Sequence, residues 1–309
     1  MDKRRFLIFL FFAITSFQFT FSQDSGRKSE SQDNKLFAFG IIADVQYADT
    51  EKAGKRDYRN SLTKLEKCIT EFNNHDLAFI ISLGDLIDRN YDSYDKPLAI
   101  LGKSKTPVYN VIGNHEFSVE EQYKKEIRKR LNNRKGYFDF EAGNMVFIVL
   151  DGTALSTFAH VKGSKPYELV MAQYEEMEKQ GLNNTTTWNG GIGEKQYKWL
   201  RKRLKKAEQT NRKVIIFCHW PLLPENGTQL WNNRAVLDLL NNHNCVIAWI
   251  SGHHHAGHYE KAANIHHLTI NGMVEAQKES SFGIMEVYPD RLWLKGYGDQ
   301  KDYNLEIVR

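Results

Sequence analysis

Six apolar runs of strand length recur along this chain, and each of them stops at a Gly, Asp, Asn or His. They are rich in β-branched and aromatic residues and show no alternation with polar residues, which is typical of strands buried on both faces of a sheet. This pattern constrains the fold more than any other feature of the sequence. The runs span residues 36–44, 77–85, 106–114, 144–151, 213–219 and 245–253.

Stretches with helical spacing of apolar residues lie between these runs, at residues 57–75, 194–209 and 234–243. Shorter, alternating, hairpin-like pieces follow near the end of the chain, from residue 266 onward. Strands that alternate with helices, followed by antiparallel strands, predict an α/β protein. Residues 152–192 are less regular and long for a connection; they are either a functional insertion or a surface insertion without a role.

The N-terminus predicts a secretory signal peptide over residues 1–22. Lys3, Arg4 and Arg5 precede a short apolar run, and Ser22 supplies a small residue before the expected cleavage point. The alternative is a membrane anchor, but the apolar run is shorter than the roughly 20 residues of a spanning helix.

Signal cleavage implies a secreted or periplasmic protein without stable membrane insertion. We expect residues 23–35 to be a flexible leader and residues 36–309 to form the functional domain. The net charge of +4 includes no long block of one sign, so nothing indicates a nucleic-acid partner. The three cysteines are no disulfide framework; we interpret them as buried thiols, with one disulfide as the alternative. The oligomeric state is left open.

Polar residues stand where five of the predicted strands end. In open α/β sheets, ligands bind beyond the carboxyl ends of the strands, so these side chains should share one cleft. Carboxylates, amides and imidazoles in one place suit divalent metal ions. Without a metal, the buried carboxylates would be unpaired charges, which is costly. The residues are Asp44 and Gln46, Asp85 and Asp88, Asn114 and His115, His219, and His253 and His255.

The order D-x-Q, G-D-x-x-D, G-N-H-E, H, G-H-x-H resembles that of the calcineurin-like metallophosphoesterases. Further stretches are similar to one subgroup, the manganese-dependent ADP-ribose/CDP-alcohol diphosphatases: "IADVQYAD" (42–49), "HWPLLP" (219–224) and "FGIMEVYPDRLWLKG" (282–296). The resemblance runs from about Leu36 to the C-terminus. It implies a four-layer α/β/β/α sandwich with mixed sheets and a site for two divalent metal ions.

Carried over position by position, the resemblance implies two sets of ligands that share Asp85. The first ion would be held by Asp44, Gln46, Asp85 and His255, and the second by Asp85, Asn114, His219 and His253. Gln46 stands where many relatives have His, and its neutral oxygen favours Mn²⁺ or Mg²⁺ over Zn²⁺; Fe²⁺ is a further alternative. We expect His254 to point away from the site, because alternate side chains of an extended backbone share a side.

Residues beside the ligands are candidates for catalysis and for substrate binding. His115 would stabilise the transition state or protonate the leaving oxygen, with Asp88 orienting it; the alternative is a His that only orients Asp85. Arg89 is a candidate for phosphate binding, and Trp188 for stacking on a base. Asn189 and Gly190 belong to an "NGG" stretch where the backbone would approach the substrate closely.

The sequence thus predicts a dinuclear metal-dependent hydrolase acting on a small nucleotide. The bond would be the phosphoanhydride of a nucleoside diphosphate derivative such as ADP-ribose or a CDP-alcohol. One alternative is a phosphodiesterase or phosphomonoesterase for cyclic nucleotides or other small esters. Another, of a different class, is a non-catalytic scaffold with the same fold, although every ligand position is filled here.

Overall fold

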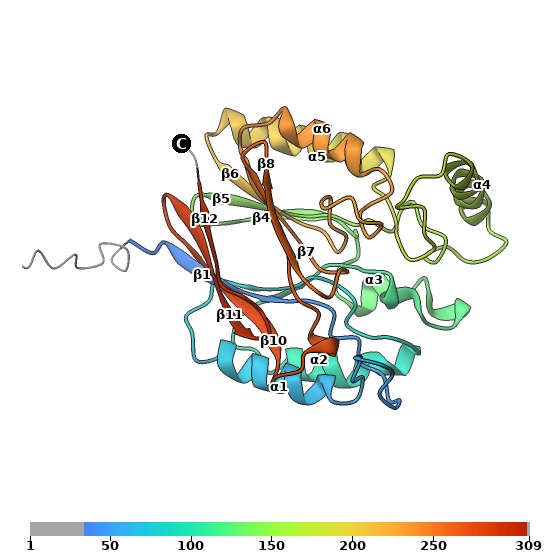
Figure 1. Ribbon diagram of the computed structural model, residues 1–309, viewed down its shortest axis with the longest axis horizontal. Helices are drawn as coiled ribbons and strands as arrows, with labels where there is room; N and C mark the ends of the chain where they lie inside the picture. Colours follow the sequence, from blue (N-terminus) through green and yellow to red (C-terminus); the bar gives the residue numbers. More distant parts are fainter. Residues whose placement is uncertain (1–33, 308–309) are drawn as a thin grey trace, which may run out of the picture. The chain divides into compact units, whose positions relative to one another are not determined.

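A computed structural model describes residues 34–307 of the chain (Figure 1). The predicted signal peptide (residues 1–22) and most of the predicted leader (residues 23–35) lie outside the described residues. Within residues 34–307, no helix is both long enough and apolar enough to cross a membrane.

The first of two sheets combines a parallel half with an antiparallel half. Strands β1, β2 and β3 pair in parallel, and β10, β11 and β12 continue the sheet antiparallel from β1. The order across the sheet is β12 (Tyr303–Glu306), β11 (Arg291–Gly298), β10 (Ser281–Val287), β1 (Phe37–Ile42), β2 (Ile80–Ser82) and β3 (Val108–Asn110).

The second sheet has a parallel centre with an antiparallel strand at each edge. Strands β5, β6, β7 and β9 are parallel neighbours, while β4 and β8 pair antiparallel with β5 and β9. The order is β4 (Phe138–Ala142), β5 (Met145–Val149), β6 (Lys213–Phe217), β7 (Val246–Ser251), β9 (Ile265–Thr269) and β8 (His258–Ala262).

The two sheets face each other across an aromatic core. Phe39 of the first sheet lies 5.6 Å from Phe147 and 5.9 Å from Phe217 of the second, measured between ring centroids in edge-on geometry. All three rings are fully buried, and packed aromatic pairs contribute roughly 0.5–1.5 kcal/mol each beyond their burial. This core fixes the distance between the sheets, and with it the distance between their strand ends.

Helices cover the outer face of each sheet, which completes four layers (Figure 1). Leu65 of α1 and Ile100 of α2 pack in the cluster over the first sheet, and Leu200 of α5 and Val236 of α6 pack in the cluster over the second. The predicted four-layer sandwich with mixed sheets is confirmed. The helices are α1 (Ser61–Phe72), α2 (Asp95–Leu101), α3 (Ile127–Arg130), α4 (Lys165–Lys179), α5 (Glu194–Gln209) and α6 (Asn233–Asn241).

All six predicted apolar runs contain a strand, and the three predicted helices are present. The expectation of late antiparallel strands is confirmed for β10 to β12, and for β9 in its pairing with β8; on its other side β9 pairs in parallel with β7. Helix α4 was not predicted within residues 152–192, because only Val170 and Met177 on it are buried. The three cysteines are free, buried thiols, as interpreted from the sequence.

Candidate metal centre

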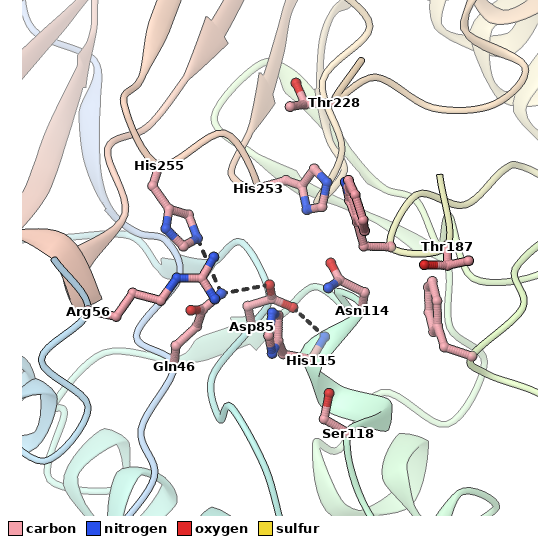
Figure 2. A pocket seen from close by; sticks show the side chains of 12 residues that line it. Gln46, Arg56, Asp85, Asn114, His115, Ser118, Thr187, Thr228, His253 and His255 are labelled. Atoms are coloured by element: carbon pink, nitrogen blue, oxygen red, sulfur yellow. Dashed lines mark hydrogen bonds between the residues drawn. The ribbon is translucent and has the colours of Figure 1, made fainter. Parts of the chain in front are cut away.

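The parallel strands of both sheets end at one pocket of about 560 Å³ (Figure 2). Strands β1, β2 and β3 approach it from the first sheet, and β6 and β7 approach it from the second. The polar residues that follow these strands therefore meet, although more than 200 positions separate some of them in sequence. Those lining the pocket are Gln46, Asp85, Asn114, His115, His253 and His255.

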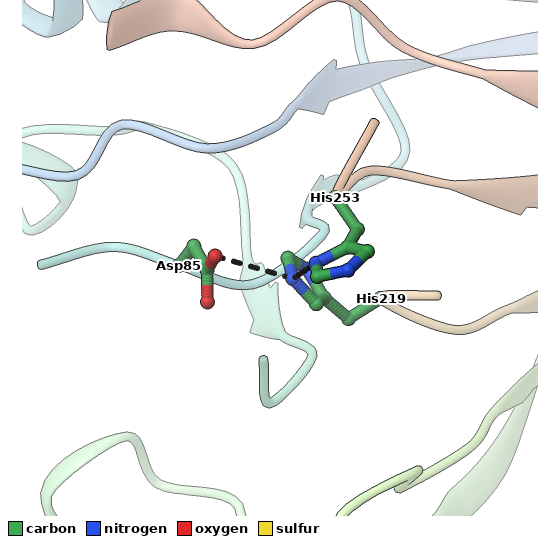
Figure 3. Close-up of side chains that lie close together, drawn as sticks. All are labelled: Asp85, His219 and His253. Carbon is green, nitrogen blue, oxygen red and sulfur yellow. Dashed lines mark hydrogen bonds and ion pairs between the residues drawn. The ribbon is translucent and has the colours of Figure 1, made fainter. Parts of the chain in front are cut away.

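Asp85 lies at the centre of these residues. Its Oδ2 is 3.2 Å from Nε2 of Gln46 on one side and 3.2 Å from Nε2 of His219 on the other. Candidate ligand atoms of Asp85, His219 and His253 all lie within 4.8 Å of one another (Figure 3). A carboxylate in this position touches both predicted ligand sets.

The contacts continue from Asp85 through each predicted set. On the first side, Nε2 of His255 lies 3.2 Å from Nε2 of Gln46 and 3.4 Å from Oδ1 of Asp44. On the second side, Nε2 of His219 lies 3.2 Å from Oδ1 of Asn114 and 3.2 Å from Nδ1 of His253. Ligands held about 2.1 Å from one ion lie roughly 3.0–3.4 Å apart, so these spacings fit two adjacent coordination shells.

An unpaired oxygen supports the same interpretation. Oε1 of Gln46 is buried and has no hydrogen-bond partner among the described residues. A buried acceptor without a partner costs about 1–3 kcal/mol. The donor set is rich in oxygen and includes a neutral amide, which fits a hard divalent cation such as Mn²⁺ or Mg²⁺. The residues present therefore fit the two-ion site that the sequence predicts.

The backbone is strained where it turns the candidate ligands inward. Asp44, Gln46, Asp85 and His253 all have positive φ, between +45° and +67°. This region is unfavourable for residues with a side chain and persists where surrounding structure enforces it, often at functional sites. The φ of His253 also shows that residues 253–255 are not extended. His253 and His255 do both line the pocket and His254 does not, but a turn rather than a strand arranges them.

Glycines next to the candidate ligands make room for them. A Cβ on Gly113 would lie 2.3 Å from Oδ1 of Asp85, and a Cβ on Gly84 would lie 2.7 Å from Nδ1 of His219. Gly84 also has a φ of +97°, which side chains rarely allow. The glycines of the "GD" and "GNH" motifs are thus required by close packing within the centre.

Each candidate histidine ligand has its second ring nitrogen hydrogen-bonded to the protein. His219 Nδ1 lies 2.8 Å from the Leu83 carbonyl, and His253 Nε2 lies 2.9 Å from Oδ1 of Asn189. His255 Nδ1 lies 3.0 Å from Oε1 of Glu275. Such partners fix the tautomer and the orientation of a metal-binding imidazole. They leave Nε2 of His219, Nδ1 of His253 and Nε2 of His255 to face the other candidate ligands.

The protonation states of Asp85 and His253 are set by burial and by neighbouring charges. Burial acts to raise the pKa of Asp85, but His219 and His115 outweigh it and hold that pKa well below its ordinary value. Burial and the charge of His219 lower the pKa of His253 well below its ordinary value, so His253 stays neutral. Burial acts to lower the pKa of His219 and of His255, but Asp85 and Asp44 outweigh it and raise each pKa to about 9. Metal binding would therefore release a proton from these two imidazoles, whereas Asp85 and His253 already have the protonation states that a metal requires.

Glu116 supports the loop that carries Asp85. Its side chain is fully buried, and its two oxygens accept hydrogen bonds from the backbone N–H groups of Asp85, Leu86 and Gly113 at 2.6–2.8 Å. The last residue of the "GNHE" motif therefore joins the ends of β2 and β3. Its role was not predicted from the sequence.

His115, Asp88 and Arg89 form a chain at the edge of the pocket. His115 lines the pocket, and its Nδ1 lies 3.0 Å from Oδ1 of Asp88. Arg89 donates from Nε and Nη2 to Oδ2 of Asp88, each at 2.9 Å, and does not line the pocket. Arg89 thus holds Asp88, which in turn holds His115 with Nε2 as the ring nitrogen left for a substrate.

The three "WNG" residues differ in their surroundings. Trp188 lines the pocket and is 53% exposed. Asn189 is fully buried, and its side chain donates to the carbonyls of Asn184 and Gly227 besides contacting His253. A Cβ on Gly190 would lie 2.2 Å from the Gly152 carbonyl oxygen, so packing within the protein requires this glycine. Neither Asn189 nor Gly190 lines the pocket.

Further contributions to the site were not predicted from the sequence. No role for Glu275 follows from the sequence; the structure places it against His255. Arg56 and Phe158 line the pocket but follow no strand and belong to no motif. His258 lies on β8, where its Nε2 is 3.3 Å from Glu260, and it does not line the pocket.

Comparison with known proteins agrees with this geometry. Residues 37–257 match the calcineurin-like phosphoesterase family. The manganese-dependent ADP-ribose/CDP-alcohol diphosphatase of Xenopus laevis is 30% identical over 90% of this chain and 92% of its own length. The enzyme of the same name from Homo sapiens is 32% identical over 87% of this chain and 92% of its own length.

A solved structure shares the fold. The crystal structure of a dimetal phosphatase from Danio rerio superposes with a TM-score of 0.80 at 28% identity, over 89% of this chain and all of the other. The family match covers β1 through the "GHHH" turn and thus every candidate ligand. This chain belongs to the calcineurin-like phosphoesterase family.

Proposed function

We propose that this chain hydrolyses the phosphoanhydride bond of nucleoside diphosphate derivatives, such as ADP-ribose or CDP-alcohols, with two divalent ions, Mn²⁺ in the first place. The observation that carries the proposal is the convergence of oxygen and nitrogen donors on both sides of Asp85. The names of the relatives from Xenopus laevis and Homo sapiens support the substrate class and the metal.

The chain offers one set of ligands for each ion. Asp44, Gln46, Asp85 and His255 would hold the first, and Asp85, Asn114, His219 and His253 would hold the second. Two bound divalent ions would supply Lewis-acid stabilisation of the phosphoryl oxygens and a hydroxide nucleophile near neutral pH.

His115 is placed to hold and deliver a proton. Its Nδ1 is engaged by Asp88, so the proton for the leaving phosphate oxygen would come from Nε2. Burial acts to lower the pKa of His115, but Asp85 and Asp88 outweigh it and raise that pKa above its ordinary value. Asp88 is a positioning residue in this scheme, because it acts through His115.

The aromatic end of the pocket is suited to a nucleobase. Trp188 and Phe158 line the pocket on the side of the 152–192 segment, and Trp188 keeps half of its surface free. A base can stack on an exposed indole, which contributes roughly 1–3 kcal/mol in nucleic-acid complexes. We therefore assign the segment 152–192 to substrate binding.

A panel of substrates tests the proposed function. With purified protein and Mn²⁺, release of nucleoside monophosphate from ADP-ribose and from CDP-choline should exceed hydrolysis of cyclic nucleotides and of monoesters. Preference for cyclic nucleotides or monoesters would contradict the assigned substrate class. Protein that binds no metal and hydrolyses none of them would be a scaffold instead.

We also propose that the protein is secreted or periplasmic, on the basis of residues 1–22. Cell fractionation tests this point. In cells that make the full-length protein, the Mn²⁺-dependent activity should be found outside the cytosol. After deletion of residues 1–22, the activity should be found in the cytosol. An unchanged distribution would contradict the proposal.

A further inference from the structure

Arg56 lines the pocket of the candidate metal centre but is not one of the candidate ligands. The residue lines the pocket together with Gln46 and His255 (Figure 2). Its Nε lies 3.5 Å from Oε1 of Glu275, and its side chain is 37% exposed. Among residues 34–307, no hydrogen bond engages either of its Nη atoms.

The position of Arg56 is built by the fold. Ala53 and Arg56 exchange two backbone hydrogen bonds of 3.0 Å across a tight turn, and Gly54 in that turn has a φ of +60°. The next residue, Asp57, donates its N–H to the Val274 carbonyl at 3.1 Å. The turn that carries Arg56 is therefore attached to the segment that carries Glu275.

That segment is in turn attached to the centre. The Val274 N–H donates to the Asp44 carbonyl at 3.0 Å, and the buried Lys64 donates from Nζ to the Val274 carbonyl at 3.1 Å. Oε1 of Glu275 is also the atom that contacts His255. Arg56 and the candidate ligand His255 thus contact the same oxygen of Glu275. The two Nη groups of Arg56 have no hydrogen-bond partner among residues 34–307.

The charge of a diphosphate requires a partner at this place. Each phosphoryl group of the substrate carries negative charge, and two ions held around Asp85 would neutralise the one that is attacked. The other would extend along the pocket, where Arg56 is the one Arg or Lys side chain among the described lining residues. A guanidinium with two free N–H groups matches a phosphate in charge and in geometry.

We propose that Arg56 binds the second phosphoryl group of the substrate, the one that is not attacked, and so makes the site selective for diphosphates. This inference rests on the proposed function. Arg89 cannot take the role in this arrangement, because Asp88 engages both its Nε and its Nη2 and it does not line the pocket.

Binding of two nucleotides to Arg56→Ala tests the proposal directly. The probes are AMP, with one phosphate, and α,β-methylene ADP, whose P–C–P bridge resists hydrolysis. In calorimetry with Mn²⁺, the variant should bind α,β-methylene ADP roughly 10- to 100-fold more weakly and AMP within about threefold of the unaltered protein. Arg56→Lys should recover only part of the loss, because it keeps the charge without the planar fork.

Lys55→Ala is the matched control. It removes one positive charge from the same turn, but Lys55 is exposed and does not line the pocket, so both affinities should stay unchanged. Circular dichroism and Mn²⁺ content verify folding and the centre in each variant. If Arg56→Ala is unfolded, Arg56→Lys decides by the same comparison.

Several results would overturn the proposal. They are an unchanged affinity for α,β-methylene ADP, an equal loss for both nucleotides, or loss of Mn²⁺ from Arg56→Ala. The ADP-ribose assay separates this failure from that of the proposed function. If the unaltered protein releases AMP from ADP-ribose and Arg56→Ala does so equally fast, only the role of Arg56 is contradicted. If the unaltered protein releases no AMP, the proposed function is contradicted.

Discussion

Two pairs of histidines on successive segments of the chain have different surroundings in this protein. His253 and His255 stand at the end of β7, with one ring nitrogen of each held by a protein acceptor and the other facing the pocket. His266 and His267 lie inside β9. His266 is paired with Tyr259 and the Glu306 carbonyl, and neither ring nitrogen of His267 has a partner among residues 34–307.

The difference shows that burial alone does not identify a functional histidine. Both pairs are largely enclosed, but only the first lies where several strands end and where carboxylates and amides converge. His267 is surrounded by the sheet, and burial lowers its pKa to about 4. At a strand end, the imidazoles have oriented partners and converge with other candidate ligands; inside the strand, burial keeps His267 neutral. The predictions below test this distinction.

The largest effect is expected at the carboxylate shared by both ligand sets. Asp85→Ala should lower kcat/KM for ADP-ribose by at least about 10³-fold, since metal ions supply several kcal/mol of transition-state stabilisation. Bound Mn²⁺, measured by mass spectrometry, should fall with it. Full activity in a folded Asp85→Ala protein would contradict the claim that the functional groups lie at the strand ends.

His115 should behave differently from the ligands beside it. His115→Ala is expected to lower kcat by roughly 10²-fold or more through loss of the proton donor, while Mn²⁺ content stays that of the unaltered protein. Kinetics and metal analysis on the same sample check this. If His115→Ala loses its metal, the residue belongs with the ligands and the proton-donor role is wrong.

A smaller effect is expected from the partner of His255. Glu275→Gln keeps the size of the side chain but weakens the hydrogen bond to His255 Nδ1, so Mn²⁺ affinity should fall about 10- to 100-fold. Titration of the metal-free protein with Mn²⁺ measures this. Excess Mn²⁺ should restore most of the activity, and an unaltered affinity would show that Glu275 does not position His255.

The smallest effect on catalysis is expected at His267. His267→Leu should leave kcat/KM within about twofold but change the stability at acid pH. In the unaltered protein the folded-state pKa, about 4, lies below the ordinary 6.5 of the unfolded chain. The unfolded chain therefore binds the extra proton first, and stability falls as pH drops from 6.5 to 4, by up to about 3 kcal/mol.

Urea unfolding at several pH values measures that loss. His267→Leu should be free of this part of the acid destabilisation, and His266→Leu, which breaks two hydrogen bonds, is the comparison variant. Equal acid sensitivity of the unaltered protein and His267→Leu would mean that His267 is not the titrating group.

Most of the fold and of the candidate metal centre can be predicted from the sequence, because both depend on local signals. Apolar runs mark the buried strands, and Asp44, Asp85, Asn114 and His219 follow such runs directly. Edge strands β4 and β8 escaped prediction because their residues are mostly half-exposed and give no continuous apolar run. Helix α4 does carry local signals, since Ser164 caps it and Pro166 stands in its first turn.

Contacts between distant segments are harder to predict. Arg56 reaches the pocket from a turn whose next residue, Asp57, is hydrogen-bonded to Val274, and no spacing in the sequence encodes that bond. Asn189 was predicted near the substrate but is turned inward onto His253. Contacts of this kind depend on how the two sheets pack together, and no pattern in a single sequence predicts that packing.

Anomalous diffraction from crystals grown with Mn²⁺ tests the central claim most directly. The account predicts two peaks, one between Asp44, Gln46 and His255 and one between Asn114, His219 and His253, with the Asp85 carboxylate shared by both. No peak at the strand ends, or a manganese ion bound elsewhere in the chain, would contradict it.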